Sequence, residues 1–326
     1  MENNGTDAWL AIRGRLVGAP ISWGVCEVPG WGMQLPVDRV LGEMRELGLR
    51  ETELGAIGWL PTDPSELASV LAAHDLRVVG GFVPLVCHRP ELRDATLAET
   101  TRMAALFQSI GADAFVTAVV SDPADWQRPP LTAPQWQRVV AMLDEIDGIV
   151  SAHELRQVVH PHLNTLIETA DEVERFLDES RVPFCLDTGH LTLGGSDPLE
   201  LAERATERVG LVHLKDVRGA IAARLRAGDV DLLTAVQAGL FAALGDGDVP
   251  IADVVLSLER NGYQGRYVLE QDVAITTGEP PVGEGPVRDV ARSVAYLRSV
   301  ESDADTAGGS ALTGAPTNHN SNRGIH

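Results

Sequence analysis

The segment FCLDTGHLTLGG, residues 184–195, joins a short apolar run to a polar group of residues and a pair of glycines. Its first part has the length and composition of a buried strand, which ends on Asp187, Thr188 and His190. In α/β folds the ends of the strands meet at one face, where ligands bind. A carboxylate and an imidazole in that place therefore indicate a functional site, and the other strands of the chain determine what meets them there.

Short β-branched or apolar runs recur along the whole chain, and each is followed by a segment with apolar residues at helical spacing. The predicted strands are 16–24, 50–55, 76–86, 113–120, 156–162, 183–190, 209–217 and 265–272. Eight strands alternating with eight helices over roughly 285 residues predict a single-domain (β/α)₈ TIM barrel. A doubly wound sheet is disfavoured, because no GxGxxG or GxxxxGK[ST] loop follows the first predicted strand.

The pattern also sets the domain limits. We expect a flexible N-terminal segment at 1–15, the barrel at 16–300, and a disordered tail at 301–326, which is poor in large apolar residues. Residues 218–249 are too long for a simple connection after the seventh strand. We expect them to form an insertion with some helix on the catalytic face.

Composition narrows the classes of partner. The chain has 47 acidic against 26 basic residues, a formal net charge of −21, which disfavours nucleic acid and membrane surfaces as partners. Its three cysteines, Cys26, Cys87 and Cys185, show no CxxC spacing, so no disulfide framework is predicted. With neither a signal peptide nor an apolar run long enough to span a membrane, we expect a cytoplasmic protein.

Four successive predicted strands end in residues that bind metals. His160, Asp187, His213 and Glu270 close the fifth to eighth strands and form the predicted metal set. Mixed nitrogen and oxygen donors suit Mn²⁺, Co²⁺, Zn²⁺ or Mg²⁺, and the lack of thiolate argues against copper(I) or an iron–sulfur cluster. Each residue taken alone is more simply a hydrogen-bonded structural group, but the four together favour a metal site.

Further side chains are predicted at the same mouth. His190 and His162 are candidates for contact with substrate, with packing as the alternative for each. Lys215 lies two residues after His213 and is placed to neutralise a substrate oxyanion, or else to pair with Asp187 or Asp216.

The first two strands add two candidates. Glu53, at the end of the second strand, faces the mouth, with a salt bridge at the rim as the alternative. Trp23, at the end of the first, offers an apolar wall for a sugar or cyclitol ring, or packs in the core.

Several motifs together resemble a known family. They are APISWG (19–24), TELG (52–55), HPHLNTLIET (160–169), CLDTGHL (185–191), VHLKDV (212–217) and LGDGDVPI (244–251). In this combination, over about residues 16–300, the chain resembles the inosose dehydratase-like branch of the xylose isomerase-like sugar isomerase and epimerase superfamily.

The resemblance implies a (β/α)₈ barrel with one divalent metal, Mn²⁺ or Co²⁺ before Zn²⁺ or Mg²⁺, held at the ends of strands five to eight. The superfamily's set is most often Glu, Asp, His and Glu, and the matching positions here are His160, Asp187, His213 and Glu270. This chain departs from the pattern at strand five, where HPH leaves open whether His160 or His162 is the ligand.

The implied reaction is dehydration of a keto-cyclitol such as 2-keto-myo-inositol. A base removes the proton α to a polarised carbonyl, and a general acid helps the β-hydroxyl to leave as water. We expect base and acid among Glu53, His190 and Lys215, with Glu270 able to serve as both ligand and base.

Other functions remain open at this stage. A ketose isomerase or epimerase with the same metal site is the main alternative, and a non-catalytic sugar-binding barrel is the third. A metal-dependent endonuclease on a related barrel is disfavoured by the acidic balance. The expected partner is a small polyol, keto-cyclitol or sugar, and by analogy with enzymes of this size and fold we also expect a homo-oligomer.

Overall fold

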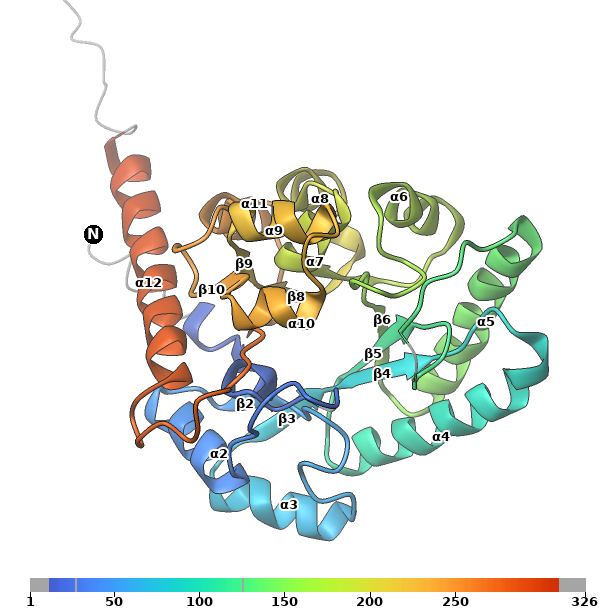
Figure 1. The fold of residues 1–326 in the computed structure, drawn as a ribbon, viewed down its shortest axis with the longest axis horizontal. Coiled ribbons are helices and arrows are strands. Elements are labelled where there is room, and N and C mark those ends of the chain that lie inside the picture. Colours follow the sequence, from blue (N-terminus) through green and yellow to red (C-terminus); the bar gives the residue numbers. More distant parts are fainter. Residues whose placement is uncertain (1–11, 27, 125, 311–326) are drawn as a thin grey trace, which may run out of the picture.

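The computed structural model describes residues 12–310 except residues 27 and 125. Its main sheet contains nine parallel strands in the order β3-β2-β1-β11-β8-β7-β6-β5-β4, with helices packed around the outside (Figure 1). These strands are β1 (Leu16–Gly18), β2 (Glu51–Glu53), β3 (Arg77–Gly80), β4 (Phe82–Leu85), β5 (Ala114–Val119), β6 (Arg156–Val159), β7 (Phe184–Asp187), β8 (Val209–Leu214) and β11 (Tyr267–Leu269). The predicted TIM barrel is confirmed.

The third predicted strand is divided into two. β3 pairs with β2 on one side and β4 pairs with β5 on the other, so the two halves of 76–86 continue the sheet in both directions. The Asp113 amide donates to the Val79 carbonyl at 2.9 Å, which joins β3 to the start of β5 and closes the barrel. A Cβ at Gly80 would lie 2.5 Å from the Ala114 carbonyl oxygen, so only glycine fits this crossing.

All eight predicted helices are present among the described residues. They are α2 (Val37–Glu46), α3 (Pro64–Ala73), α4 (Arg93–Ser109), α5 (Ala133–Ala152), α6 (Ala170–Glu179), α8 (Pro198–Arg204), α11 (Ile251–Arg260) and α12 (Pro286–Ser310), with short 3₁₀ turns at Pro20–Trp23, Pro90–Leu92 and Thr206–Arg208. Asp63 and Asp197 cap α3 and α8 by accepting backbone N–H groups, and Thr169 forms a capping box with Glu172 at α6.

Two predicted strands stop early, and helical turns follow them. The strand expected at 16–24 ends at Gly18, and Pro20–Trp23, which include the candidate Trp23, form a 3₁₀ turn. The strand expected at 183–190 stops at Asp187, and Thr188–Gly194 form a further helix, α7. The Asp187 carboxylate accepts the His190 amide at 2.7 Å and so starts this helix one residue after the strand. His190 therefore belongs to the first turn of a helix at the barrel mouth.

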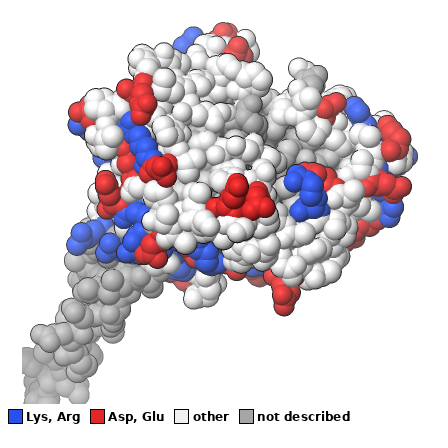
Figure 2. Space-filling model, turned by 90° about the horizontal axis from the view of Figure 1, so that it is seen from below, with Lys and Arg blue, Asp and Glu red and all other residues white. Residues whose placement is uncertain are grey.

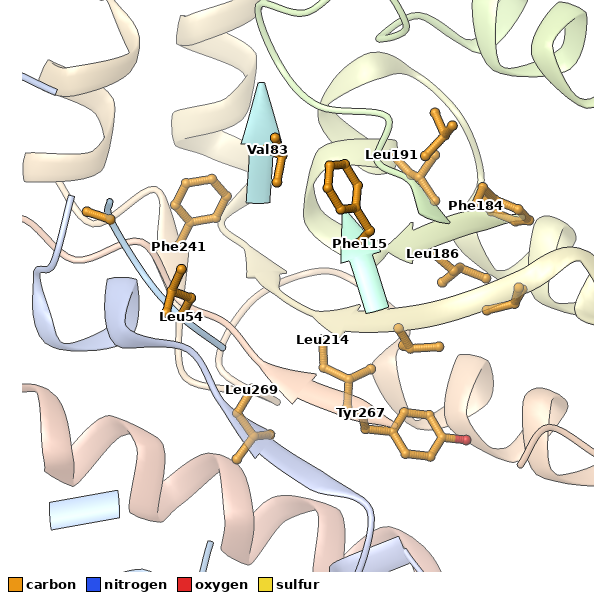
Figure 3. Close-up of a cluster of buried hydrophobic side chains, with 14 of the residues drawn as sticks. Leu54, Val83, Phe115, Phe184, Leu186, Leu191, Leu214, Phe241, Tyr267 and Leu269 are labelled. Carbon is orange, nitrogen blue, oxygen red and sulfur yellow. The ribbon is translucent and has the colours of Figure 1, made fainter. Parts of the chain in front are cut away.

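The core has an inner and an outer part. Inside the barrel, apolar side chains from the strands pack together, among them Val79, Val116, Val158, Leu211 and Val268. Between the strands and the helices lies a larger apolar cluster that includes Phe115, Phe184, Leu214 and Tyr267 (Figure 3). The filled barrel interior leaves the mouth as the place for a site.

The predicted insertion after the seventh strand is structured. It contains α9 (Gly219–Arg226), α10 (Leu232–Gln237) and β10 (Phe241–Ala242), which pairs antiparallel with β9 (Asp216–Val217). The Asp216 carboxylate accepts the amides of Gly245, Gly247 and Val249 at 2.9–3.1 Å and holds the loop that leads away from β10. The insertion is thus attached directly to the residue that follows Lys215.

The two ends of the chain lie partly outside the described residues. This applies to 1–11 of the predicted N-terminal segment and to 311–326 of the predicted tail. Helix α12 continues through Ser310, ten residues beyond the predicted limit of the barrel.

The surface carries both kinds of charge, since acidic and basic side chains are interspersed on the face shown in Figure 2. Within the described part of the chain, no helix has the length and apolarity needed to cross a membrane.

Candidate active site

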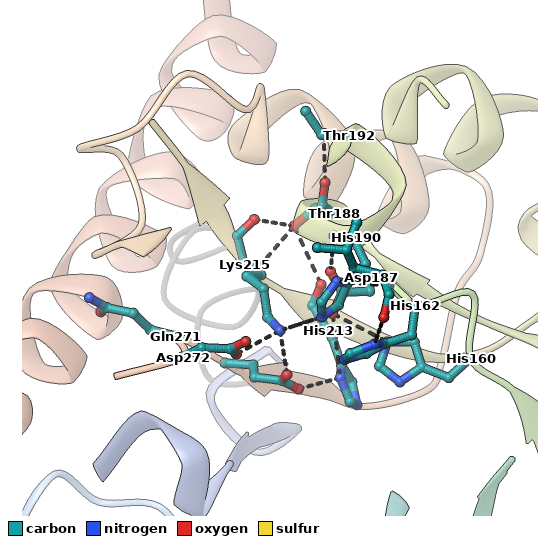
Figure 4. Close-up of polar contacts among 12 residues, drawn as sticks. His160, His162, Asp187, Thr188, His190, Thr192, His213, Lys215, Gln271 and Asp272 are labelled. Atoms are coloured by element: carbon teal, nitrogen blue, oxygen red, sulfur yellow. Dashed lines mark hydrogen bonds and ion pairs between the residues drawn. The ribbon is translucent and has the colours of Figure 1, made fainter. Parts of the chain in front are cut away.

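The predicted metal set meets at the carboxyl end of the barrel (Figure 4). His160 Nε2 lies 3.4 Å and His213 Nδ1 lies 3.7 Å from Asp187 Oδ2, and His213 Nδ1 also contacts Glu270 Oε2. All four side chains are at least nine-tenths buried. In the parallel sheet, β7 and β8 place Asp187 directly beside His213, which explains how residues far apart in sequence come together.

Several atoms of this set have no hydrogen-bond partner among the described residues. They are both ring nitrogens of His160 and Oδ2 of Asp187, whereas Nδ1 of His213 pairs with Glu270. Buried polar atoms without partners are costly, and unpartnered ones that face a common point indicate a missing ligand. The two carboxylate oxygens of Asp187 have different contacts: Oδ1 caps α7, and Oδ2 faces the imidazoles of His160 and His213.

The structure brings His160, and not His162, next to Asp187. His162 Nδ1–H donates to the Leu163 carbonyl at 2.7 Å, and its ring lies against that of His190 at an interplanar angle of 37°, with 3.7 Å between the ring centroids. His162 and His190 therefore form one wall of the mouth, where Phe82 and Trp126 also contact the His162 ring.

Glu53 orients His213. The His213 Nε2–H donates to Glu53 Oε1 at 3.1 Å, which leaves Nδ1 facing Asp187 and Glu270. Burial alone would lower the pKa of His213, but the nearby Cys185, Glu270 and Glu53 raise it well above its ordinary value. In this arrangement a proton on Nδ1 stands where a metal cation would otherwise bind.

Lys215 is the single lysine in the sequence, and it is fully buried. Its Nζ lies 2.6 Å from Glu270 Oε1, 2.8 Å from Asp272 Oδ1 and 3.7 Å from Asp187 Oδ2. Burial would lower the pKa of this amine, but the three carboxylates raise it, so the side chain is an ammonium ion. The predicted pairing with Asp187 is present, whereas Asp216 is used by the loop after β10.

The ammonium also reaches the histidine wall. Lys215 Nζ lies 2.8 Å from His190 Nε2. Burial holds the pKa of His190 well below its ordinary value, so this ring is neutral and Nε2 accepts a proton of the lysine. Lys215 thus connects the carboxylates to the residues that line the mouth.

The cluster carries more negative than positive charge. Four carboxylates face two cationic side chains: Asp187, Glu270 and Asp272 lie around Lys215, and Glu53 pairs with His213. Burial raises the pKa of Asp272 to about 6, which is how a carboxyl group in excess of its counterions responds. A divalent cation would neutralise this excess, and the histidine and carboxylate donors suit one of the Mn²⁺, Co²⁺ or Zn²⁺ kind. The residues present fit the metal that the sequence predicted.

Trp23 is placed apart from these contacts. Its ring is fully buried, and its indole N–H donates to Glu43 Oε2 on α2 at 2.8 Å. This burial favours the alternative in which Trp23 packs in the core. Contact of Trp23 with substrate stays a prediction.

Sequence reasoning missed the aromatic part of the mouth. Phe241, from the insertion, lies with its ring 4.9 Å from Lys215 Nζ and 6.1 Å from the His190 ring. Phe82, at the start of β4, contacts both His160 and His162. No local pattern distinguishes these two residues from ordinary core aromatics.

Comparison with known proteins finds similar TIM barrels. A family model described as the xylose isomerase-like TIM barrel matches residues 41–300. An inosose dehydratase from Geobacillus kaustophilus (strain HTA426) is 31% identical over 271 residues, which cover 79% of this chain and 87% of the relative. The rhizopine catabolism protein MocC from Rhizobium meliloti is 30% identical over 263 residues, covering 78% and 80%.

Solved structures share the fold at low sequence identity. An L-ribulose 3-epimerase superposes with a TM-score of 0.67 at 15% identity, covering 92% of this chain and 98% of the other. The IOLI protein with a bound zinc atom gives a TM-score of 0.65 at 13% identity, covering 89% and 98%.

Proposed function

The chain belongs to the xylose isomerase-like TIM barrel family, and on that premise we propose that it is a metal-dependent lyase that dehydrates a keto-cyclitol such as 2-keto-myo-inositol. The observation that carries the proposal is the set of unpartnered donor atoms on His160 and Asp187, beside His213, a buried ammonium and a histidine wall. The relatives named inosose dehydratase support the choice of substrate.

His160, Asp187, His213 and Glu270 would hold the metal. When bound there, a divalent ion supplies Lewis acidity that acidifies the proton α to the substrate carbonyl. The chain's own residues then bind the substrate, keep water out and move two protons.

Glu53 is our choice for the base. With Oε1 engaged by His213, Oε2 is the oxygen available to take the α-proton. Glu53 is 8% exposed, whereas Asp187 is completely buried, so the Glu53 carboxylate lies nearer to solvent than that of Asp187. In this assignment Glu270 remains a ligand.

Lys215 and His190 supply the acid. The ammonium proton shared between Lys215 Nζ and His190 Nε2 is transferred to the departing β-hydroxyl, which leaves as water. The proton taken up by Glu53 later returns to this pair, so one turnover removes one water and restores the enzyme. Phe241 and the His162 ring provide apolar surface for the carbon ring of the substrate.

The test is to add 2-keto-myo-inositol to metal-free protein, with and without Mn²⁺ or Co²⁺, and to follow product absorbance together with mass. Metal-dependent loss of one water is expected, and Asp187→Asn should abolish it. Asp197→Asn, at the cap of α8, is the matched control and should keep the activity. A product of unchanged mass would replace the lyase by an isomerase or epimerase, and binding of metal without any turnover would favour the non-catalytic barrel.

A further inference from the structure

Cys185 lies directly beneath the proposed metal set. It precedes Asp187 by two residues on β7, so both side chains point to the same side of the strand, into the barrel. Its thiol is completely buried in the inner cluster with Val158, Leu211 and Val268. The proposed reaction gives this residue no role.

The sulfur is nevertheless close to two of the histidines. Cys185 Sγ and one ring nitrogen each of His160 and His213 all lie within 4.8 Å of one another. In a tetrahedral zinc site, the usual bond lengths separate nitrogen and sulfur donors by about 3.3–3.6 Å. Small rotations of the three side chains would therefore bring the donors to bonding distance.

His160 is available to turn toward it. Neither ring nitrogen of His160 has a hydrogen-bond partner among the described residues, its side chain is 99% buried, and its Nε2 lies 3.4 Å from Asp187 Oδ2. His213 is held by Glu53 through Nε2 and pairs with Glu270 through Nδ1, so a cation bound here would replace the pair between His213 and Glu270.

We propose that His160, Cys185 and His213 form a second metal site, one layer deeper in the barrel, that takes thiophilic divalent cations such as Zn²⁺ and Cd²⁺. On binding, the Cys185 thiol loses its proton to solvent and the resulting thiolate bonds to the cation. A thiolate with two imidazoles favours soft or borderline ions, whereas the upper set with its two carboxylates suits Mn²⁺.

The two sites exclude each other, because both need His160 and His213. Zn²⁺ in the deeper site would therefore displace Mn²⁺ from the upper set, and the protein would select between metals by depth in the barrel. This inference uses two ligands of the proposed function but not its reaction, so each can fail without the other.

X-ray absorption at the zinc edge tests the site on the full wild-type chain loaded with one equivalent of Zn²⁺. We expect one sulfur neighbour at about 2.3 Å in addition to nitrogen at about 2.0–2.1 Å. Cys185→Ser should remove the sulfur and weaken Zn²⁺ binding by about tenfold or more, with little change in Mn²⁺ affinity. Cys87→Ser, at another buried cysteine, is the matched control and should keep the sulfur signal.

Asp187→Asn separates the two sites further. It should weaken Mn²⁺ binding while the zinc–sulfur signal persists, because Asp187 belongs to the upper set alone. A wild-type spectrum with nitrogen and oxygen neighbours and no sulfur would overturn the proposal. The measurement on wild-type protein needs no variant, so a folding defect in Cys185→Ser would not obscure it. A spectrum without sulfur would overturn the deeper metal site and leave the proposed turnover of a keto-cyclitol untouched.

Discussion

Replacement of Lys215 by methionine is the most direct test of the charge balance in the cluster. Methionine nearly matches the length of the lysine stem, so the change removes the ammonium while filling most of the same space. Left behind are Glu270 and Asp272, which lie 2.6 and 2.8 Å from Nζ, and Asp187 at 3.7 Å. All would remain buried without their cation.

The size of the effect follows from these distances. With an effective dielectric constant of about 20, each of the two short contacts is worth about 6 kcal/mol of gross Coulomb attraction. Most of this is offset by the cost of removing the charges from water, and breaking a buried pair by deleting one partner typically costs about 3–5 kcal/mol. We expect Lys215→Met to lower the free energy of unfolding by that amount when no metal is present.

Urea unfolding in a chelator, and again with Mn²⁺, measures both parts of this prediction. Mn²⁺ should narrow the difference in unfolding free energy between Lys215→Met and wild type, because the ion restores positive charge beside the same carboxylates. Arg288→Met is the control, since Arg288 and Glu284 form an exposed pair whose loss should change stability by less than about 1 kcal/mol. If Lys215→Met unfolds in chelator at the same urea concentration as wild type, the cluster does not depend on this ammonium and the reasoning fails.

Three further predictions follow from neighbouring contacts. Glu53→Leu should weaken Mn²⁺ binding by about 10–100-fold, because it removes the acceptor that orients His213, and Glu53→Gln should lose less; calorimetric titration compares the two, and equal losses would contradict an orienting role. The pKa of buried His190 lies well below that of the unfolded chain, so its contribution to stability is present above about pH 6.5 and is lost as the pH falls through that value, by about 1.4 kcal/mol per pH unit. In chelator, His190→Gln should reduce the slope of the unfolding free energy against pH by the equivalent of at most one proton. An unchanged slope between pH 5 and 7 would argue against a neutral His190. Asp216→Asn should destabilise the protein by about 1–3 kcal/mol and raise KM for substrate more than it lowers kcat, because the loop after β10 loses its acceptor and with it the position of Phe241; unaltered melting and kinetics would show that the loop is held by other contacts.

Much of the fold was predictable because the alternation of strands and helices is written in local patterns. The eight strand positions, the helices and the insertion at 218–249 all follow from periodicity and length. The end of the strand at 183–190 was predicted wrongly because one residue both ends the strand and begins a helix. Asp187 ends a strand and caps a helix, so apolar spacing alone could not show that α7 begins at Thr188.

The site was predictable to the extent that strand ends define it. That His160, Asp187, His213 and Glu270 lie close together was predictable because a parallel barrel brings consecutive strand ends together. Phe241 and Phe82 were not, because their place depends on how an insertion folds back and on which side of a strand faces the mouth. Which of His160 and His162 lies next to Asp187 likewise needed three dimensions, because both follow the same strand and only the fold shows that His162 turns to Leu163.

The two proposed metal sites lie at different depths in the barrel, one in the charged layer at the mouth and one at the apolar layer below it. Directly below the charged layer, the interior is lined by Val79, Val116, Val158 and Val268, which exclude water and lower the local dielectric constant. A cation near this boundary is attracted strongly by the carboxylates above it, but it can descend only if a donor below replaces the oxygens it leaves. Cys185 is the one residue of this inner cluster whose side chain can act as that donor. The apolar layer therefore makes the position of a bound ion depend on its affinity for sulfur, and this dependence is what distinguishes Zn²⁺ from Mn²⁺ at a site built from the same two histidines.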